Sequence, residues 1–331
     1  MPRRSLFAFG VLLALVIVAA GVLWLVPSDH YIVLPDRARP VDPLVSVPGE
    51  DEEQESAGIY MVDVRVGRAN LFERLFPGIY DGAELVPESV LNPVGVSDRQ
   101  RRTSSLNQMS LSQQIAITVA LRELGRQVSV QAVGAEVVLV TPDAPADGKL
   151  QVGDVVVEAR GEPIADTIDL RQAMRPVRPG STVELTVRRE EEEEIELSVG
   201  TQASQQGPRR AVMGVQVRDA QEFHFPLDVE IDAGSVGGPS AGLAFALEIV
   251  DELDSDLEDG RRVVATGEIT LAGDVLAVGG VRQKTIGARE AGASVFLVPD
   301  ANAAEARAQA GDLEIVPVSD FDEALAALAT R

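Results

Sequence analysis

The chain has 331 residues, of which 45% are apolar, a net charge of −23 and no cysteine. This length suits two or three domains with cores of their own, and the apolar content argues against wholesale disorder. The negative charge disfavours nucleic acid as a partner, and the lack of cysteine excludes disulfides and Cys-ligated metal. The two histidines, His30 and His224, show no metal-ligand spacing, so neither a metal nor a cofactor is predicted.

The N-terminus carries an uncharged run, Leu6–Val26, preceded by Arg3 and Arg4. At about 1.5 Å per residue, a helix of this length spans roughly 30 Å, the thickness of a bilayer's hydrocarbon core. The basic residues predict a cytoplasmic N-terminus and place the rest of the chain outside the cytoplasmic membrane. A cleaved signal peptide ending near Val18–Ala20 is the alternative. The run continues through Val22–Val26, beyond what a signal peptide needs, which favours an uncleaved, single-pass anchor.

The next hundred residues carry few motifs. Residues 27–57 are proline-rich and then acidic, which predicts a solvated linker. Alternation predicts a strand over Tyr60–Val66, and a short amphipathic helix is predicted over Asn70–Phe76. The apolar face of that helix could contact the membrane surface, a second subunit or a neighbouring core, and the last is favoured. A longer helix is predicted over Ser104–Leu124, stopped by Gly125.

From Arg126 to about Gly200 the pattern is one of short strands and turns, with a helix at Thr167–Arg175 and a charged hairpin tip at Glu190–Glu194. From about residue 205 strands and helices alternate, which predicts an α/β or α+β layered domain. The strands are expected at Val137–Val140, Val183–Val187, Ile195–Val199, Val212–Val217, Val229–Asp232, Val263–Thr266, Val295–Val298 and Glu314–Val316, and the later helices at Ser240–Leu253, Arg282–Ala291, Ala303–Ala310 and Phe321–Ala329.

Ser240 stands in the motif Gly237-Gly238-Pro239-Ser240-Ala241-Gly242. The glycines permit a sharp turn and a close approach to a ligand, and Pro239 suits the first turn of a helix. Free backbone N–H groups of Gly237 and Gly238 could hold the oxyanion that forms when the serine hydroxyl attacks a carbonyl. The alternative is that Ser240 only caps the helix, and the motif alone does not separate the two readings.

Lys284 is one of only two lysines, the other being Lys149, among twenty-nine basic residues. Arginine keeps its proton in proteins, whereas a desolvated lysine can act as a general base near neutral pH. Apolar neighbours and the positive end of the helix that starts near Arg282 would lower its pKa. Thr266 could hydrogen-bond its amine. We therefore interpret Ser240 and Lys284 as a hydrolytic dyad with Thr266 in support.

Several ordered motifs resemble the proteolytic domain of the Lon family of serine-lysine peptidases, over about Met213 to Leu328. They are Gly238–Gly242, Thr266–Thr270 through Gly273, and Gly279-Gly280 with Lys284. The resemblance implies Ser240 as nucleophile, Lys284 as base and Thr266 as a supporting residue.

The chain departs from that family in two respects. ATP-dependent Lon proteins commonly have an acidic residue where this chain has Gly237. The sequence also contains no phosphate-binding Gly-x-x-x-x-Gly-Lys-Ser/Thr motif, since Lys149 is followed by Leu150 and Asp143 replaces the first glycine. Proteolysis by this chain is therefore expected not to need ATP.

The middle of the chain resembles PDZ domains of bacterial proteases, through Gly134-Ala135-Glu136-Val137-Val138, the turn at Ala144–Ala146 and the segment Leu150–Gly161. The resemblance implies an extended peptide bound between Val137–Thr141 and the helix at Thr167–Arg175. Backbone N–H groups near Gly134 and Ala135 would receive a terminal carboxylate. A scaffold without peptide affinity is the alternative.

The whole arrangement resembles the bacterial membrane-anchored PDZ–Lon proteins, and predicts a multi-domain chain: an N-terminal transmembrane helix, a β-rich PDZ domain and an α/β (α+β) Lon proteolytic domain. The expected function is an ATP-independent, membrane-anchored serine endopeptidase acting on unfolded or extracytoplasmic polypeptides, and the arrangement is compatible with a homo-oligomer. The rival is an adaptor with an idle dyad; a phosphoryl-transfer enzyme that uses the glycine loop as an anion cradle is less favoured. The predicted parts are residues 1–5 cytoplasmic, 6–26 anchor, 27–125 linker and helical region, 126–204 PDZ domain and 205–331 proteolytic domain.

Overall fold

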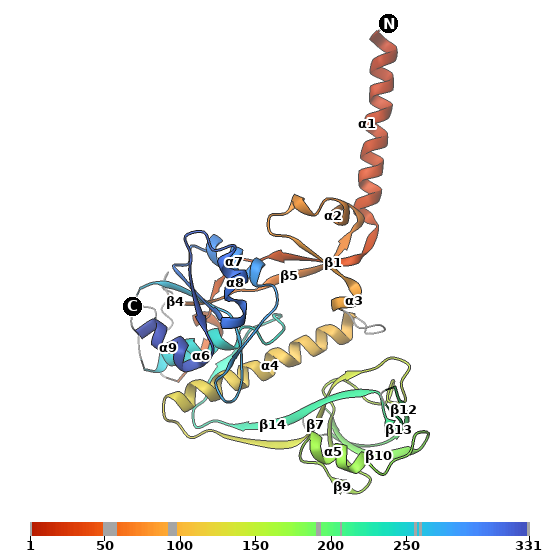
Figure 1. The fold of residues 1–331 in the computed structure, drawn as a ribbon, viewed down its shortest axis with the longest axis vertical. Coiled ribbons are helices and arrows are strands. Elements are labelled where there is room, and N and C mark those ends of the chain that lie inside the picture. The colour runs from red at the N-terminus through yellow and green to blue at the C-terminus, as the bar shows by residue number, and fades with distance from the viewer. Residues whose placement is uncertain are drawn as a thin grey trace.

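The computed structural model describes residues 2–48, 58–91, 98–189, 193–205, 207–254, 257 and 260–329. It shows an N-terminal helix that extends away from a mixed α/β body, and a separate β-rich domain on the other side of the long helix α4, Asp98–Glu123 (Figure 1). The predicted multi-domain, mixed α/β architecture is confirmed.

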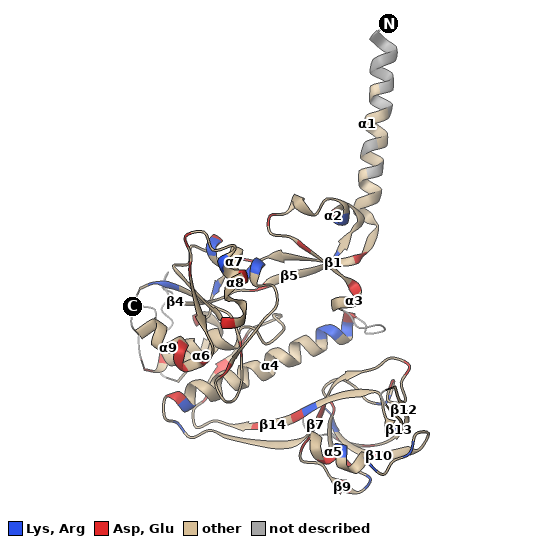
Figure 2. Ribbon diagram, in the orientation of Figure 1, with Lys and Arg blue, Asp and Glu red and all other residues tan. Residues whose placement is uncertain are grey.

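The N-terminal helix α1, Pro2–Leu25, has exposed apolar side chains, among them Phe9, Leu12, Ile17 and Trp24. The coloured part of this helix carries no charged residue (Figure 2). Among the described residues, however, no helix is both long and apolar enough to cross a membrane. The helix is therefore present, and the predicted transmembrane span is not supported.

Residues 27–48 are not a linker, and that prediction is wrong. β1, Pro27–Pro35, is the central strand of an antiparallel sheet between β5, Val64–Asn70, and β6, Glu84–Pro87. Tyr31, Ile32 and Val33 are buried there, so the segment folds because its apolar residues enter a core despite the flanking prolines. The acidic run at residues 50–55 lies outside the described residues.

The body is built on a sheet in the order β2–β4–β16–β19–β20, in which the last four strands are parallel. Its strands are β2 Arg39–Pro40, β4 Gly58–Met61, β16 Arg262–Ala265, β19 Val295–Pro299 and β20 Glu314–Val318. Ile59 and Met61 face one core, while Tyr60 and Val62 face another, as the alternation of a strand requires. Helices therefore cover both faces of the sheet.

One face is covered by α4, α6 (Gly242–Leu253) and α9 (Phe321–Ala329), and the other by α7 (Val281–Glu290) and α8 (Ala303–Arg307). Two small strand pairs flank these layers: β3 (Val45–Ser46) with β15 (Glu230–Ile231), and β17 (Glu268–Ile269) with β18 (Val275–Leu276). The helices predicted after residue 205 are all found, α6 beginning two residues later than expected because Ser240 and Ala241 remain in the turn.

The predicted helix at Asn70–Phe76 is α2, Leu71–Leu75, started by a capping box between Asn70 and Glu73. None of its residues is buried, and Leu75 and Phe76 are more than half exposed. The favoured reading, a cap on a neighbouring core, is therefore wrong. The short helix α3, Glu88–Leu91, follows β6.

The β-rich domain has the strand order β11–β10–β8–β7–β14, and β9 pairs with β8. Its elements are β7 Ser129–Val140, β8 Val155–Ala159, β9 Glu162–Pro163, α5 Thr167–Met174, β10 Thr182–Arg189, β11 Glu193–Gly200 and β14 Val215–His224, with the pair β12 Gln202–Ser204 and β13 Gly207–Val212 beside them. β14 lies within the predicted proteolytic domain but pairs along the length of β7. The domain boundary at 204/205 therefore cuts through a single sheet.

The close approach of α7 to the end of β1 gives a test of the packed N-terminal segment. A Cβ added at Gly287 would overlap the backbone oxygen of Asp36. Gly287→Ala should lower the free energy of unfolding by about 1–3 kcal/mol, although alanine is the better helix former, because the backbone of β1 must shift. Urea unfolding followed by circular dichroism measures the change.

Gly67→Ala is the matched control, because a Cβ there meets nothing within 4 Å. It should change the free energy of unfolding by no more than about 0.5 kcal/mol. Equal stability of the two variants would show that residues 27–36 do not pack against α7.

Candidate active site

Ser240 lies in the turn that leads from β15 to α6. The N-cap of α6 is Ala241, with no side-chain cap, so Ser240 does not serve as the helix cap. Its backbone oxygen accepts hydrogen bonds from Gly267 N (2.9 Å) and from Thr266 Oγ1 (3.1 Å), which fixes the turn against the end of β16. The serine hydroxyl is left to face Lys284.

Lys284 lies in the first turns of α7, which begins after Gly280 in a left-handed conformation (φ 69°). A side chain at Gly280 would also press on Val64, so glycine meets both demands. The amine of Lys284 donates to Ser240 Oγ at 2.7 Å and to Thr266 Oγ1 at 2.9 Å. The structure thus brings together the three residues that the sequence singled out.

The Lys284 side chain is 2% exposed and Thr266 is fully buried. Burial lowers the pKa of Lys284 to about 8, while the nearby Asp63 carboxylate opposes that shift. Burial in turn raises the pKa of Asp63, and its ion pair with Arg39 acts against this. The amine is therefore neutral in a useful fraction of molecules at mildly alkaline pH, as a general base requires.

Helix α4 holds the loop in front of the serine. Ser105 O accepts a hydrogen bond from Gly238 N (2.8 Å), and Ser112 Oγ donates to Pro239 O (2.9 Å). Gly237 packs so closely on Ser105 that a Cβ would overlap its hydroxyl, which explains why no acidic residue stands there. The N–H of Gly238, predicted as an oxyanion donor, is instead bound to α4 in this structure.

A cavity of about 560 Å³ opens in front of the dyad. Its walls come from residues 235–240, called here the nucleophile loop, from the residues before and at the start of α7, and from residues 36–64, the N-terminal segment. They include Asp36, Arg39, Asp63, Val64, Val236, Glu268 and Val278. No sequence pattern predicted that residues 36–64 contribute to these walls. Asp63 is conspicuous in the sequence as a single acidic residue between Val62 and Val64, but no local pattern indicated that it would lie near Lys284.

The predicted peptide-binding strand of the PDZ domain is not at an edge. Gly134–Val138 belongs to β7, which lies between β8 and β14, and Gly134 N already donates to Ala165 O at 2.9 Å. That site prediction is therefore wrong. Among the described strands, β14 is the edge of this sheet on the side of α5, where Thr167 N donates to Asp219 Oδ1 at 2.9 Å.

The low count of lysines makes the ionisation of Lys284 directly observable. With ¹³C-lysine incorporated, the chain should give two Cε signals, and Lys284→Arg should remove one and so assign it. That signal should titrate with a midpoint near 8, below the ordinary 10.5, because burial disfavours the ammonium. A midpoint at the ordinary value would show that the amine is hydrated rather than buried.

Comparison with known proteins gives a family match for each of the two domains. Residues 203–331 match the model of the Lon protease (S16) C-terminal proteolytic domain, and residues 122–200 match that of the PDZ domain. A Lon protease of Rickettsia bellii is 35% identical over 121 residues, 35% of this chain and 16% of that protein. One of Roseiflexus castenholzii is 38% identical over 105 residues, 30% of this chain and 13% of that protein.

A third Lon protease, of Rhizobium meliloti, is 29% identical over 288 residues, which are 84% of this chain and 34% of that protein. The chain spans about a third or less of the length of these curated relatives. It contains a PDZ domain and a Lon-type proteolytic domain, and it is homologous to Lon proteases.

Proposed function

We propose that the chain is a serine endopeptidase that cleaves polypeptides with Ser240 as nucleophile and Lys284 as general base, without ATP. The observation that carries the proposal is the 2.7 Å contact between the Lys284 amine and the Ser240 hydroxyl. The homology to Lon proteases and the buried, pKa-lowered lysine support it. ATP independence rests on the sequence, which lacks the phosphate-binding loop motif.

In the proposed reaction, neutral Lys284 takes the proton of the Ser240 hydroxyl while Oγ bonds to the scissile carbonyl carbon. The tetrahedral intermediate expels the amine of the peptide, which leaves with the proton from Lys284, and an acyl ester remains on Ser240. Water then attacks the ester with Lys284 as base, and the serine regains its proton. Thr266 orients the amine throughout through its 2.9 Å hydrogen bond.

Stabilisation of the oxyanion needs a donor next to Ser240. The Gly238 N–H could fill that role only once its bond to Ser105 opens. We therefore propose that the described state is a resting state, in which α4 holds the nucleophile loop.

The PDZ domain would capture peptide along the outer edge of β14, beside α5, and present it to the proteolytic domain.

The first test uses casein without ATP, near pH 8.5. Ser240→Ala and Lys284→Arg should each lower kcat/KM by at least about a thousandfold, because each removes half of a unit that acts together. The wild-type kcat/KM should rise with pH up to about 8 and then level, since Lys284 must first lose its proton.

Lys149→Arg is the matched control, because it alters the other lysine, which is exposed in the PDZ domain, and should keep full activity. Equal cleavage by wild type and both dyad variants would contradict the assignment. A folded wild-type chain that cleaves nothing, but binds unfolded polypeptide as well as Ser240→Ala does, would favour the adaptor function.

Membrane attachment remains a proposal: the uncharged run Leu6–Val26 would anchor the chain in the cytoplasmic membrane, with the catalytic domain outside the cytoplasm. The exposed apolar side chains of α1 support it. The full chain should float with lipid vesicles in a density gradient and stay with them in high salt. Leu12→Arg together with Leu15→Arg should release it. Flotation of this double variant as complete as that of wild type would contradict the anchor.

A further inference from the structure

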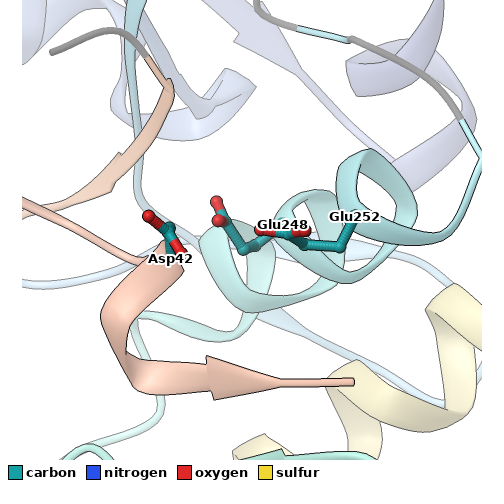
Figure 3. Close-up of side chains that lie close together, drawn as sticks. All are labelled: Asp42, Glu248 and Glu252. Atoms are coloured by element: carbon teal, nitrogen blue, oxygen red, sulfur yellow. The ribbon is translucent and has the colours of Figure 1, made fainter. Parts of the chain in front are cut away.

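Three carboxylates from two separate parts of the body meet away from the dyad. Asp42 begins the 3-10 turn η1, Asp42–Leu44, while Glu248 and Glu252 lie one turn apart on α6. One oxygen from each residue lies within 4.8 Å of the other two (Figure 3). Three carboxyl groups this close would repel one another strongly if all were ionised and nothing compensated their charge.

Glu248 is the residue that sets this cluster apart from an ordinary acidic surface. It is 2% exposed, between the fully buried Leu247 and Ile249, and its Oε2 atom is buried without a hydrogen-bond partner. A carboxyl group in such a place needs either a proton or a cation.

We propose that Asp42, Glu248 and Glu252 bind one hard divalent cation, of the Ca²⁺ or Mg²⁺ class. A site made only of carboxylate oxygens suits these cations, whereas zinc prefers nitrogen and sulfur ligands. Asp42 and Glu252 are only half-buried, so water can complete the coordination from the solvent side. The sequence pattern predicted no metal site, because Asp42 lies far from the two glutamates along the chain.

The position of the site gives the cation a structural consequence for the nucleophile loop. After η1 comes β3, which pairs with β15, and Leu44 O accepts a hydrogen bond from Asp232 N at 2.8 Å. The chain then runs directly to Ser240 and into α6. A cation bound by Asp42 and α6 would therefore link two parts of the structure. One is η1 with β3 and its partner β15, which precedes the nucleophile loop, and the other is α6, which follows that loop.

Binding is tested with the full chain freed of metal by EDTA and dialysis. Calorimetric titration with CaCl₂, and separately with MgCl₂, should show one cation bound per chain for at least one of the two. At about a hundredfold excess over the Kd, that cation should raise the thermal midpoint by about 5 °C. Glu248→Gln and Asp42→Asn should each weaken binding at least tenfold, since the affinity of such sites follows the number of carboxylates.

Glu290→Gln, an exposed change on α7, is the control and should bind as wild type does. In EDTA, Glu248→Gln should melt above wild type, because the uncompensated buried carboxyl is gone. The Asp42→Asn variant keeps the test decisive if Glu248→Gln fails to fold. Absence of binding by both cations, or binding by Asp42→Asn equal to wild type, would overturn the site and leave Glu248 as a protonated acid.

Discussion

The proteolytic domain is arranged around the desolvation of one amine. Moving Lys284 out of water lowers its pKa from 10.5 to about 8, which amounts to about 3 kcal/mol when the lysine is protonated in both folded and unfolded states. Below pH 8 the folded state carries that penalty in full, and it is relieved as the pH rises from 8 towards 10.5. Two hydroxyls, of Ser240 and Thr266, are the hydrogen-bond partners that make the burial tolerable.

The surroundings of that amine come from more of the chain than the Lon-type domain alone. Arg39 and Asp63 lie far before residue 203, where the match to the Lon proteolytic domain begins, yet both line the cavity, and the Asp63 carboxylate raises the pKa of Lys284 against the effect of burial. Arg39 begins β2, which pairs with β4, and Asp63 follows β4, which pairs in parallel with β16, the strand directly before Thr266. The N-terminal segment is thus a structural part of the catalytic body.

Local patterns predicted what depends on local sequence. The helices after residue 205 follow their apolar spacing. The motifs around Ser240, Thr266 and Lys284 lie together because each follows a strand of the same sheet or begins a helix that packs on it. Strand pairs between segments far apart in the sequence could not be predicted from local patterns. Nothing in Pro27–Pro35 indicates that it is a central strand, and nothing in β14 indicates that its partner is β7 rather than a strand of the body. The error at Gly134–Val138 has the same origin, since an edge is defined only by the strand that covers it.

Glu248, unlike these strand pairs, could have been singled out from the sequence. The run Leu243–Ile249 is apolar on every side, which is typical of a helix surrounded by protein, and a glutamate inside it is the exception that needs a partner.

Helix α4 lies between the two domains and contacts the loop before Ser240. It packs along α6 and contacts β7 of the PDZ sheet. It also forms two hydrogen bonds with the loop before Ser240: Ser105 O accepts one from Gly238 N, and Ser112 Oγ donates one to Pro239 O. A cavity of about 320 Å³ lies where α4, the PDZ strands and the loop meet, with the Glu136–Arg218 ion pair in its wall. Since β7 and β14 form one continuous ribbon, the strand edge next to α5 and the face that touches α4 belong to the same pair of strands. Helix α4 therefore contacts both the PDZ strands and the loop before Ser240, and it holds the same N–H of Gly238 that an oxyanion would need.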